Sequence, residues 1–319
     1  MALPSFICTG FQKSGTTTLF AILKQHPDVA LCRDVKEPMY YRIPVVWRIG
    51  GRRYYEARYF GHIEPGDTRT LGEVNAGLNF THCARKVSRD IPRGTKLIFM
   101  MRNPVDRSYS AYRYFIARGF LPREDVRYDL EHGHAAGFDH YVHEVLDDAE
   151  QRGDIMRKRL KYLVFSQSNY ATCIEEYLHY YDRKDMRFVF FEEFVADQHA
   201  ACLDLYEFLG LEDREGIDYH IHANGDCDRA TSAKAPKRLQ IAKGFYYGFH
   251  EFIAMGYWAP GLMRRYSDFY DRLRAKSMQP DDDRSKVLPE TRAYLQSYYD
   301  DEVRKLEQLA GRDLSGLWF

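Results

Sequence analysis

The sequence predicts an α/β fold, a single domain in which helices flank a central parallel sheet of four to five strands. Short segments of the chain, most of them apolar, have the length of buried parallel strands. These runs lie at residues 6–8, 29–32, 70–75, 97–101 and 186–191. Segments with helical spacing separate them, and this alternation is typical of a sheet covered on both faces. A length of 319 residues fits one large domain of this kind.

The run at 6–8 leads into a glycine-bounded loop. Gly10 and Gly15 bracket a turn, and the threonines at 16–18 can cap the helix that follows. A strand, a glycine loop and a helix N-terminus aim several backbone N–H groups at one point, which favours a phosphate. The layout resembles a Walker A loop and predicts a P-loop-like nucleotide-binding fold. It differs in its lysine, which lies inside the loop as Lys13 instead of directly after the second glycine.

The run at 97–101 ends in an arginine rather than in the magnesium-binding aspartate of a Walker B strand. A helix begins after Pro104 and carries Ser110. Arg102 by its charge and Ser110 by its hydroxyl can converge on a second phosphate. Two anion sites without a metal carboxylate indicate a nucleotide with phosphates on both sides of its ribose, and no metal is implied.

These motifs together resemble the sulfotransferases that use 3′-phosphoadenosine 5′-phosphosulfate (PAPS). The segment 12–17 (Gln-Lys-Ser-Gly-Thr-Thr) and the pair Arg102 and Ser110 carry the resemblance. It is closest to the carbohydrate branch that includes the heparan sulfate N- and 3-O-sulfotransferases, in which His26-Pro27 and Lys36-Glu37-Pro38 occur in the same order. The similarity covers roughly residues 5–115. It implies sulfuryl transfer from PAPS to a hydroxyl or amine of a glycan, with a small-molecule secondary metabolite as the alternative acceptor.

The resemblance also implies the nucleotide-binding residues. The first loop would hold the 5′-phosphosulfate, and the arginine–serine pair would hold the 3′-phosphate. The set is Gln12, Lys13, Ser14, Gly15, Thr16, Thr17, Arg102, Ser110 and Arg229. Arg229 stands in a stretch, 224–234, that resembles the family loop closing over the nucleotide. Lys234, Lys237 and Arg238 are alternatives for the same contact.

Three residues are candidates for the chemistry itself. Glu37 precedes a proline, which holds it in an extended conformation, and the resemblance implies that it is the general base. Lys13 would stabilise charge during transfer, and His82 is the runner-up base. Glu73 either orients a loop or the acceptor, or pairs with an arginine. Val74 stands where the heparan branch commonly has a lysine.

Composition narrows the function further. Lysine plus arginine equals aspartate plus glutamate at 46 each, so no global charge indicates nucleic acid or membrane as a partner. No signal peptide or membrane-spanning segment is visible. The six cysteines lack metal-ligand spacing, and the family's cysteine pair around the late loop is absent, which fits a bacterial, cytoplasmic enzyme. The abundance of tyrosine, 25 residues, supplies amphipathic surface for a polar substrate cleft.

Two other classes of function stay open. A nucleoside triphosphate kinase or hydrolase lacks support because the Walker lysine and aspartate are missing. A non-catalytic nucleotide-binding protein would be expected to have lost Lys13 or Glu37, and both remain. We therefore expect one sulfotransferase domain over residues 1–319. Its nucleotide-binding core would lie at about 4–115 and 160–240, and its C-terminal helical part at 241–319.

Overall fold

The chain forms two compact units. The computed structural model describes residues 2–33, 36–117, 120–152, 159–221, 230–231, 265, 269, 272, 279–280 and 283–319. The first unit comprises Met1–Arg107, Gln167–Ala223 and Tyr299–Phe319, and the second comprises Ser108–Ser166 and Asn224–Tyr298. One sulfotransferase domain over residues 1–319 stays a prediction.

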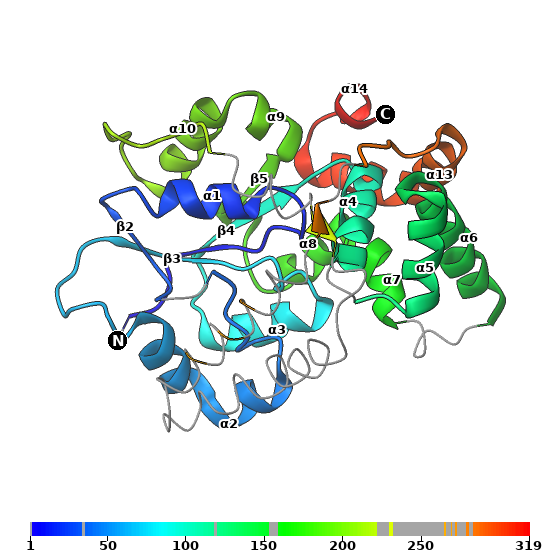
Figure 1. Cartoon of the computed structure of the whole chain (residues 1–319). Coiled ribbons are helices and arrows are strands. Elements are labelled where there is room, and N and C mark those ends of the chain that lie inside the picture. Colours follow the sequence, from blue (N-terminus) through cyan, green and yellow to red (C-terminus); the bar gives the residue numbers. More distant parts are fainter. Residues whose placement is uncertain are drawn as a thin grey trace. The chain divides into compact units, whose positions relative to one another are not determined.

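The first unit contains a five-stranded sheet in which every strand is parallel to its neighbours (Figure 1). The strands are β1 (Phe6–Cys8), β2 (Val29–Leu31), β3 (Thr70–Val74), β4 (Lys96–Met101) and β5 (Met186–Phe190). Their order is β2-β3-β1-β4-β5, and in this register Phe6 of β1 pairs with Gly72 and with Lys96. The predicted α/β fold with a parallel sheet is confirmed, and each strand lies where an apolar run predicted it.

The order of the strands places a switch point at β1. After β1 the chain moves outward to β2, returns to β3, and then crosses β1 to build β4 and β5 on its other side. Because all strands are parallel, the loops that follow them share one edge of the sheet. In open sheets of this type, ligands bind beyond the carboxyl ends of the strands at such a switch point.

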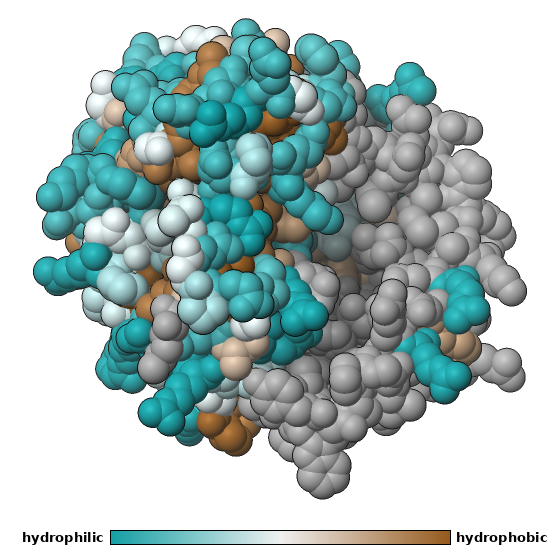
Figure 2. All heavy atoms as spheres, turned by 90° about the vertical axis from the view of Figure 1, so that its left-hand side faces the viewer, coloured by the Kyte–Doolittle hydropathy of each residue, from teal (hydrophilic) through white to brown (hydrophobic). Residues whose placement is uncertain are grey.

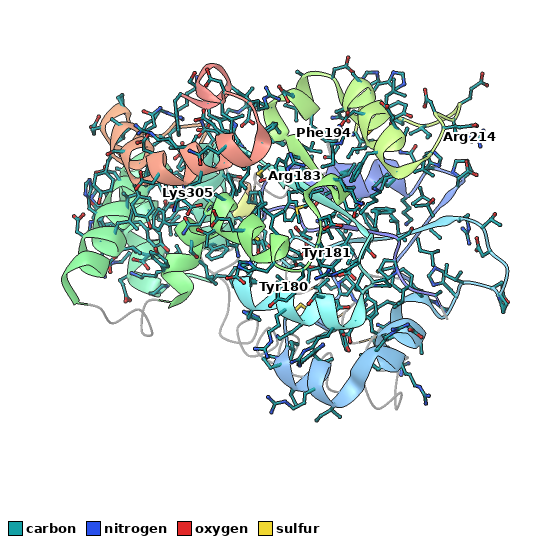
Figure 3. The ribbon with its side chains drawn as sticks, turned by 180° about the vertical axis from the view of Figure 1, so that it is seen from behind. Tyr180, Tyr181, Arg183, Phe194, Arg214 and Lys305 are labelled. Carbon is teal, nitrogen blue, oxygen red and sulfur yellow. The ribbon has the colours of Figure 1, made fainter. Side chains whose placement is uncertain are left out.

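Helices cover both faces of this sheet. One face carries α1 (Thr16–Leu23), α9 (Phe191–Ala196) and α10 (Gln198–Leu209), whose apolar side chains form a buried cluster with alternate residues of β1 and β4. The other face carries α3 (Thr81–Asp90) and α8 (Tyr170–Leu178), which pack against each other. Figure 3 labels Phe194 of α9 on the first side and Tyr181, just after α8, on the second.

A group of buried tyrosines packs near β3. The segment after β2 supplies Tyr40 and Tyr41, and α2 (Pro44–Tyr55) supplies Tyr55. The π-helix η1 (Glu56–Phe60) adds Tyr59, whose ring centroid lies 5.5 Å from that of Tyr55. These side chains are fully buried. For this group the expectation that tyrosines line a substrate cleft is wrong, since their rings fill the core instead.

The remaining elements of the first unit surround the sheet. They are the 3₁₀-helix η2 (Arg183–Asp185), the first turn of α4 (Pro104–Ala117), the end of α13 (Pro289–Ala310) and α14 (Ser315–Trp318). Asn103 starts α4, because its Oδ1 accepts hydrogen bonds from the N–H groups of Val105 (3.0 Å) and Asp106 (3.3 Å). The Nδ2 of the same residue donates to the Trp318 carbonyl and so joins α14 to the end of β4.

The second unit is mainly helical among its described residues. It contains the rest of α4, the first part of α13, and α5 (Arg123–His132), α6 (His134–Arg152) and α7 (Arg159–Ser166). It also contains a two-stranded antiparallel pair, β6 (Ala230–Thr231) and β7 (Gln279–Pro280). The stretch 224–234 was expected to form a loop, and β6 within it corrects that expectation. Period-based reasoning does not detect a strand of two residues, because two residues carry no period.

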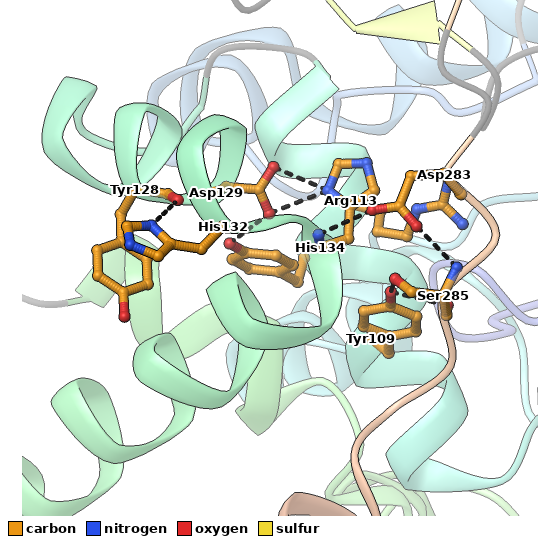
Figure 4. A network of polar contacts seen from close by, with 9 residues as sticks. Tyr109, Arg113, Tyr128, Asp129, His132, His134, Asp283 and Ser285 are labelled. Atoms are coloured by element: carbon orange, nitrogen blue, oxygen red, sulfur yellow. Dashed lines mark hydrogen bonds and ion pairs between the residues drawn. The ribbon is translucent and has the colours of Figure 1, made fainter.

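A partly buried polar network in the second unit fastens the segment 283–285 to α4 and α6 (Figure 4). Tyr109 donates to the Ser285 carbonyl (2.9 Å), and Arg113 Nη2 donates to the Asp283 carbonyl (2.9 Å). Burial alone would raise the pKa of Asp283, but hydrogen bonds from the N–H groups of His134 and Ser285 lower it to about 2. Tyr109 and Arg113 flank Ser110 on α4, so the network steadies the helix segment that carries this serine.

The described part of the face seen in Figure 2 is mostly hydrophilic, and hydrophobic residues appear there in small groups. In the portion of the chain that the structure describes, every helix is too short or too polar to cross a membrane.

Candidate active site

The candidate site lies at the carboxyl edge of the sheet in the first unit. Three segments meet there: the loop 9–15 after β1, the segment 36–38 after β2, and Arg102 after β4. Lys36 reaches Thr16 at the start of α1, and Arg102 reaches Lys13 in the loop.

The loop after β1 first continues the strand and then turns sharply. The N–H groups of Thr9 and Phe11 donate to the carbonyls of Ile98 and Met100 on β4 (2.8 and 2.9 Å). Lys13 then adopts a positive φ of 69°, which no other non-glycine residue in the described ranges does. A left-handed conformation at a lysine costs free energy of order 1–3 kcal/mol and is typical of functional loops.

Gly15, with φ 87°, is the N-cap of α1, and no side chain caps the helix. The expectation that the threonines at 16–18 cap α1 is therefore wrong. They lie inside the first turn, and the left-handed bend at the preceding glycine places the cap there. The first N–H groups of α1 have no carbonyl partner within the helix, and they point to the loop side of the helix end.

Close packing explains the glycine at position 10. A Cβ atom on Gly10 would lie 2.5 Å from Thr16 Cγ2 and 2.8 Å from Met100 Cβ. The loop therefore lies directly on α1 and β4 without room for a side chain. This contact fixes the path of the backbone between the two glycines.

Two hydroxyl groups are buried within this loop. Ser14 and Thr9 are fully buried, and neither Ser14 Oγ nor Thr9 Oγ1 has a hydrogen-bond partner among the described residues. A buried hydroxyl without a partner costs free energy of about 1–3 kcal/mol. An anion at the end of α1 would accept a hydrogen bond from Ser14 and from the uncapped N–H groups, so the residues present fit a phosphate or phosphosulfate group.

Lys36 joins the first turn of α1 to the candidate base. Its Nζ donates to Thr16 Oγ1 at 3.0 Å and to Glu37 Oε1 at 2.9 Å. The Glu37 side chain is 38% exposed and that of Lys36 is 20% exposed. Two predicted site residues, Thr16 and Glu37, are thus held together by a lysine to which the sequence analysis gave no role. Its place beside Glu37 in the Lys-Glu-Pro stretch was the available signal.

Arg102 is the third component of the site. Its Nη1 donates to the Lys13 carbonyl (3.4 Å), and its guanidinium carbon lies 4.6 Å from the centre of the Phe191 ring. The hydroxyl of Tyr170 donates to the Arg102 carbonyl (2.7 Å) and holds its backbone. The arginine at the end of β4 and the loop after β1 are therefore adjacent.

Glu73 and Asn75, at the end of β3, form a buried polar pair beneath the segment 36–38. Burial raises the pKa of Glu73 to about 7, although hydrogen bonds from Tyr55 and Asn75 act in the opposite direction. Glu73 accepts hydrogen bonds from the Tyr55 hydroxyl and from Asn75 Nδ2. The hydrogen-bond partners of Glu73 are thus a tyrosine and an asparagine rather than an arginine, and the arginine alternative is not supported.

Other predicted residues are not brought to these contacts. His82 is the second residue of α3, exposed, with its ring centroid 5.9 Å from that of Phe80. Ser110 is half-buried on the part of α4 that belongs to the second unit. Gln12, within the loop, and Thr17, in the first turn of α1, are half-buried. Arg229 and its alternatives Lys234, Lys237 and Arg238 lie outside the described residues.

Comparison with solved structures shows which proteins share this fold. A sulfotransferase from Alicyclobacillus acidocaldarius superposes on the chain with a TM-score of 0.59 at 22% sequence identity, over 99% of both chains. At this identity the similarity concerns the fold, which is the P-loop-like fold of sulfotransferases.

Curated proteins give a second comparison. The chain is 30% identical over 151 residues to the membrane-associated sulfotransferase kil1 of Dictyostelium discoideum, covering 47% of this chain and 30% of that protein. It is 22% identical over 286 residues to a bifunctional heparan sulfate N-deacetylase/N-sulfotransferase of Drosophila melanogaster, covering 83% of this chain and 25% of that protein. The chain thus matches only about a quarter to a third of the length of these relatives.

A family model completes the comparison. The model of the sulfotransferase domain matches residues 3–226, which include the loop after β1, the segment 36–38 and Arg102. This match covers more than half of the chain. The chain therefore belongs to the sulfotransferase domain family.

Proposed function

We propose that this protein transfers the sulfuryl group of PAPS to a hydroxyl or amine of a glycan and releases adenosine 3′,5′-bisphosphate. The observation that carries the proposal is the double contact of Lys36, whose Nζ reaches both Thr16 Oγ1 and Glu37 Oε1. This contact holds a candidate base beside the helix terminus at which the donor's 5′-phosphosulfate would bind. Base and sulfuryl group would then lie within reach of the same acceptor atom.

The donor would be held at two points. Lys13, Ser14 and the N–H groups at the start of α1 would bind the 5′-phosphosulfate, which supplies the partner that the buried Ser14 hydroxyl requires. Gln12 and Thr17 would complete this loop. Arg102 and Ser110 would bind the 3′-phosphate, with Arg229 as a further ligand. Charge-assisted hydrogen bonds of this kind contribute about 1.5–3 kcal/mol each.

The transfer itself needs positioning more than covalent catalysis, because the attacking and leaving oxygens must lie in line with the sulfur. Glu37 would take the proton of the acceptor hydroxyl or amine as the new bond to sulfur forms. The bond between sulfur and the bridging oxygen breaks, and the electron pair stays on that oxygen of adenosine 3′,5′-bisphosphate. Lys13 and the loop N–H groups would stabilise the charge that develops there. His82 stays the alternative base.

A glycan acceptor is supported by the exposure of the base and by one class of relative. The Glu37 side chain is 38% exposed, so a bulky polymer can reach it. Relatives that match most of this chain are named as heparan sulfate N-deacetylase/N-sulfotransferases. A hydroxyl on a small molecule is the alternative acceptor.

Transfer of radiolabelled sulfate from PAPS tests the proposal. The purified protein is offered unsulfated and partly sulfated heparan-type glycans beside a panel of small alcohols and phenols. We expect label on a glycan, and a loss of about 10²–10⁴ in rate for Glu37→Gln, which keeps the shape of the side chain but not its basicity. Label on small molecules alone would overturn the glycan acceptor. Near-wild-type turnover of Glu37→Gln together with a large loss for His82→Ala would move the base to the histidine.

A further inference from the structure

A fully buried carboxylate lies beneath the candidate base and is not part of the mechanism above. Glu73 belongs to β3 and is 0% exposed. Burial of an ionisable group is costly unless hydrogen bonds compensate it, so its surroundings should contain donors. They do: the Tyr55 hydroxyl donates to one carboxylate oxygen, and Asn75 Nδ2 donates to the other at 2.7 Å.

Asn75 links this carboxylate to the segment that carries Glu37. Its Nδ2 also donates to the carbonyl of Pro38 at 2.8 Å, so each amide hydrogen has its own acceptor. Its Oδ1 accepts the N–H of Gly77 at 3.0 Å, which fixes the orientation of the amide. The reverse orientation would place the amide oxygen against a carboxylate and a carbonyl. The backbone N–H of Asn75 donates to the Cys8 carbonyl on β1 (2.9 Å), so Asn75 is anchored to the sheet.

We propose that Glu73 is a positioning residue that acts through Asn75 on the Pro38 carbonyl and so fixes the direction of Glu37; this inference rests on the proposed role of Glu37 as base. The mechanism is geometric. Glu37 directly precedes Pro38, and a residue before proline is restricted to extended conformations. Once the Pro38 carbonyl is held, few rotations remain that could turn the Glu37 carboxylate away from Lys36.

The charge of Glu73 strengthens the hydrogen bonds that it accepts from Tyr55 and Asn75. An ionised carboxylate accepts from both Tyr55 and Asn75, whereas a protonated one must direct its own hydrogen at one of them. Burial raises the pKa of Glu73 to about 7. The titratable groups that face it are Cys32, Tyr41, Tyr55, Cys83 and Tyr177. Burial raises the pKa of each of these groups as well, so all five are neutral near pH 7.

Two variants and one matched control separate positioning from general stability. Asn75→Ala removes the bond to Pro38 and the bond to Glu73. Glu73→Gln keeps an oxygen acceptor for Asn75 and can donate to the Tyr55 oxygen instead. Tyr55→Phe removes the other bond to Glu73 but leaves the contact between Asn75 and Pro38 intact. All three are compared at a temperature at which each is folded, as judged by circular dichroism.

Three quantities are measured on each variant: hydrogen exchange of the peptide covering residues 36–43, kcat of sulfate transfer, and the affinity for adenosine 3′,5′-bisphosphate. For Asn75→Ala we expect faster exchange, a loss in kcat of at least about tenfold, and nucleotide affinity within about twofold of wild type. Glu73→Gln should retain most of the rate but lose the part of the rate–pH profile that titrates near pH 7. Tyr55→Phe should keep kcat within about threefold.

Unchanged exchange in Asn75→Ala would overturn the proposal, as would faster exchange with unchanged kcat. An equal loss of kcat in Tyr55→Phe would show that stability alone is responsible. Failure of the proposed function has a different signature: wild-type protein without transfer activity, or full activity of Glu37→Gln. In that case the exchange of residues 36–43 still decides whether Asn75 holds this segment.

Discussion

At the scale of single residues, two glutamates of the site have opposite environments. Glu37 is partly exposed and contacts Lys36 at 2.9 Å, whereas Glu73 is fully buried and accepts hydrogen bonds from two neutral donors, Tyr55 and Asn75. A partly exposed carboxylate can meet an acceptor and exchange its proton with solvent. A buried one can only act on its neighbours, so the two residues are suited to different tasks.

The burial of Glu73 predicts a pH dependence of stability. Its pKa is raised from 4.5 to about 7 in the folded protein. Between these values the folded state keeps a proton that the unfolded state has released, so the free energy of unfolding falls as the pH rises from about 4.5 to about 7. The shift corresponds to roughly 3 kcal/mol.

Glu73→Gln should remove this contribution. Relative to wild type, the variant should gain roughly 3 kcal/mol in free energy of unfolding between pH 4.5 and pH 8. Urea unfolding at a series of pH values measures the difference, and other titrations cancel because they are common to both proteins. Parallel stability curves for wild type and variant would contradict the buried, proton-binding state of Glu73.

Lys13 is expected to act on the transition state more than on binding. Lys13→Ala should lower kcat by about 10²–10³, because the charge it faces develops during transfer. Its effect on the affinity for adenosine 3′,5′-bisphosphate should be much smaller. Lys24→Ala, at the exposed end of α1, is the matched control and should leave both quantities unchanged. Unchanged turnover of Lys13→Ala at saturating PAPS would show that Lys13 does not contribute to the transfer step.

At the scale of elements, the loop between β1 and α1 was well predicted in its position but not in its details. Two glycines and a short apolar run predicted the turn, since both signals are local in sequence. The N-cap at Gly15 depends instead on the left-handed backbone, and the burial of Ser14 depends on packing. The hydrogen bonds of Asn75 to Glu73 and Pro38 could not be predicted from local sequence either, because Asn75 and Pro38 are 37 residues apart in the chain.

Packing around Gly10 predicts the effect of adding one carbon atom. Gly10→Ala would bring Cβ to 2.5 Å from Thr16 Cγ2, so the loop must shift. Overpacking of this kind costs about 1–3 kcal/mol, and the displaced loop should bind adenosine 3′,5′-bisphosphate more weakly. Thermal unfolding and calorimetry measure both effects.

Gly316→Ala is the control for that substitution. Gly316 lies in α14, and nothing is within 4 Å of its added Cβ. Since alanine favours helix, this variant should be as stable as wild type or up to about 1 kcal/mol more stable. Equal stabilities of Gly10→Ala and Gly316→Ala would contradict the close packing of the loop.

At the scale of the whole molecule, the strand order explains why the site lies where it does. The switch at β1 brings the loop after β1 beside the end of β4, and the contact between Arg102 and the Lys13 carbonyl marks this junction. Short, mostly apolar segments were enough to predict the parallel sheet, because β1, β2 and β4 are almost wholly buried. The sequence did not indicate the strand order, which depends on contacts between distant segments, nor the division into two units.

Calorimetric titration with nucleotides tests the central claim, that this site reads the 3′-phosphate of PAPS. Because Arg102 would form a charge-assisted hydrogen bond worth about 1.5–3 kcal/mol with that phosphate, adenosine 3′,5′-bisphosphate should bind at least about tenfold more tightly than AMP or ADP. Arg102→Ala should abolish most of this preference while leaving the affinity for AMP nearly unchanged. Equal affinities of the wild-type protein for ADP and adenosine 3′,5′-bisphosphate would contradict the assignment of PAPS as the sulfate donor.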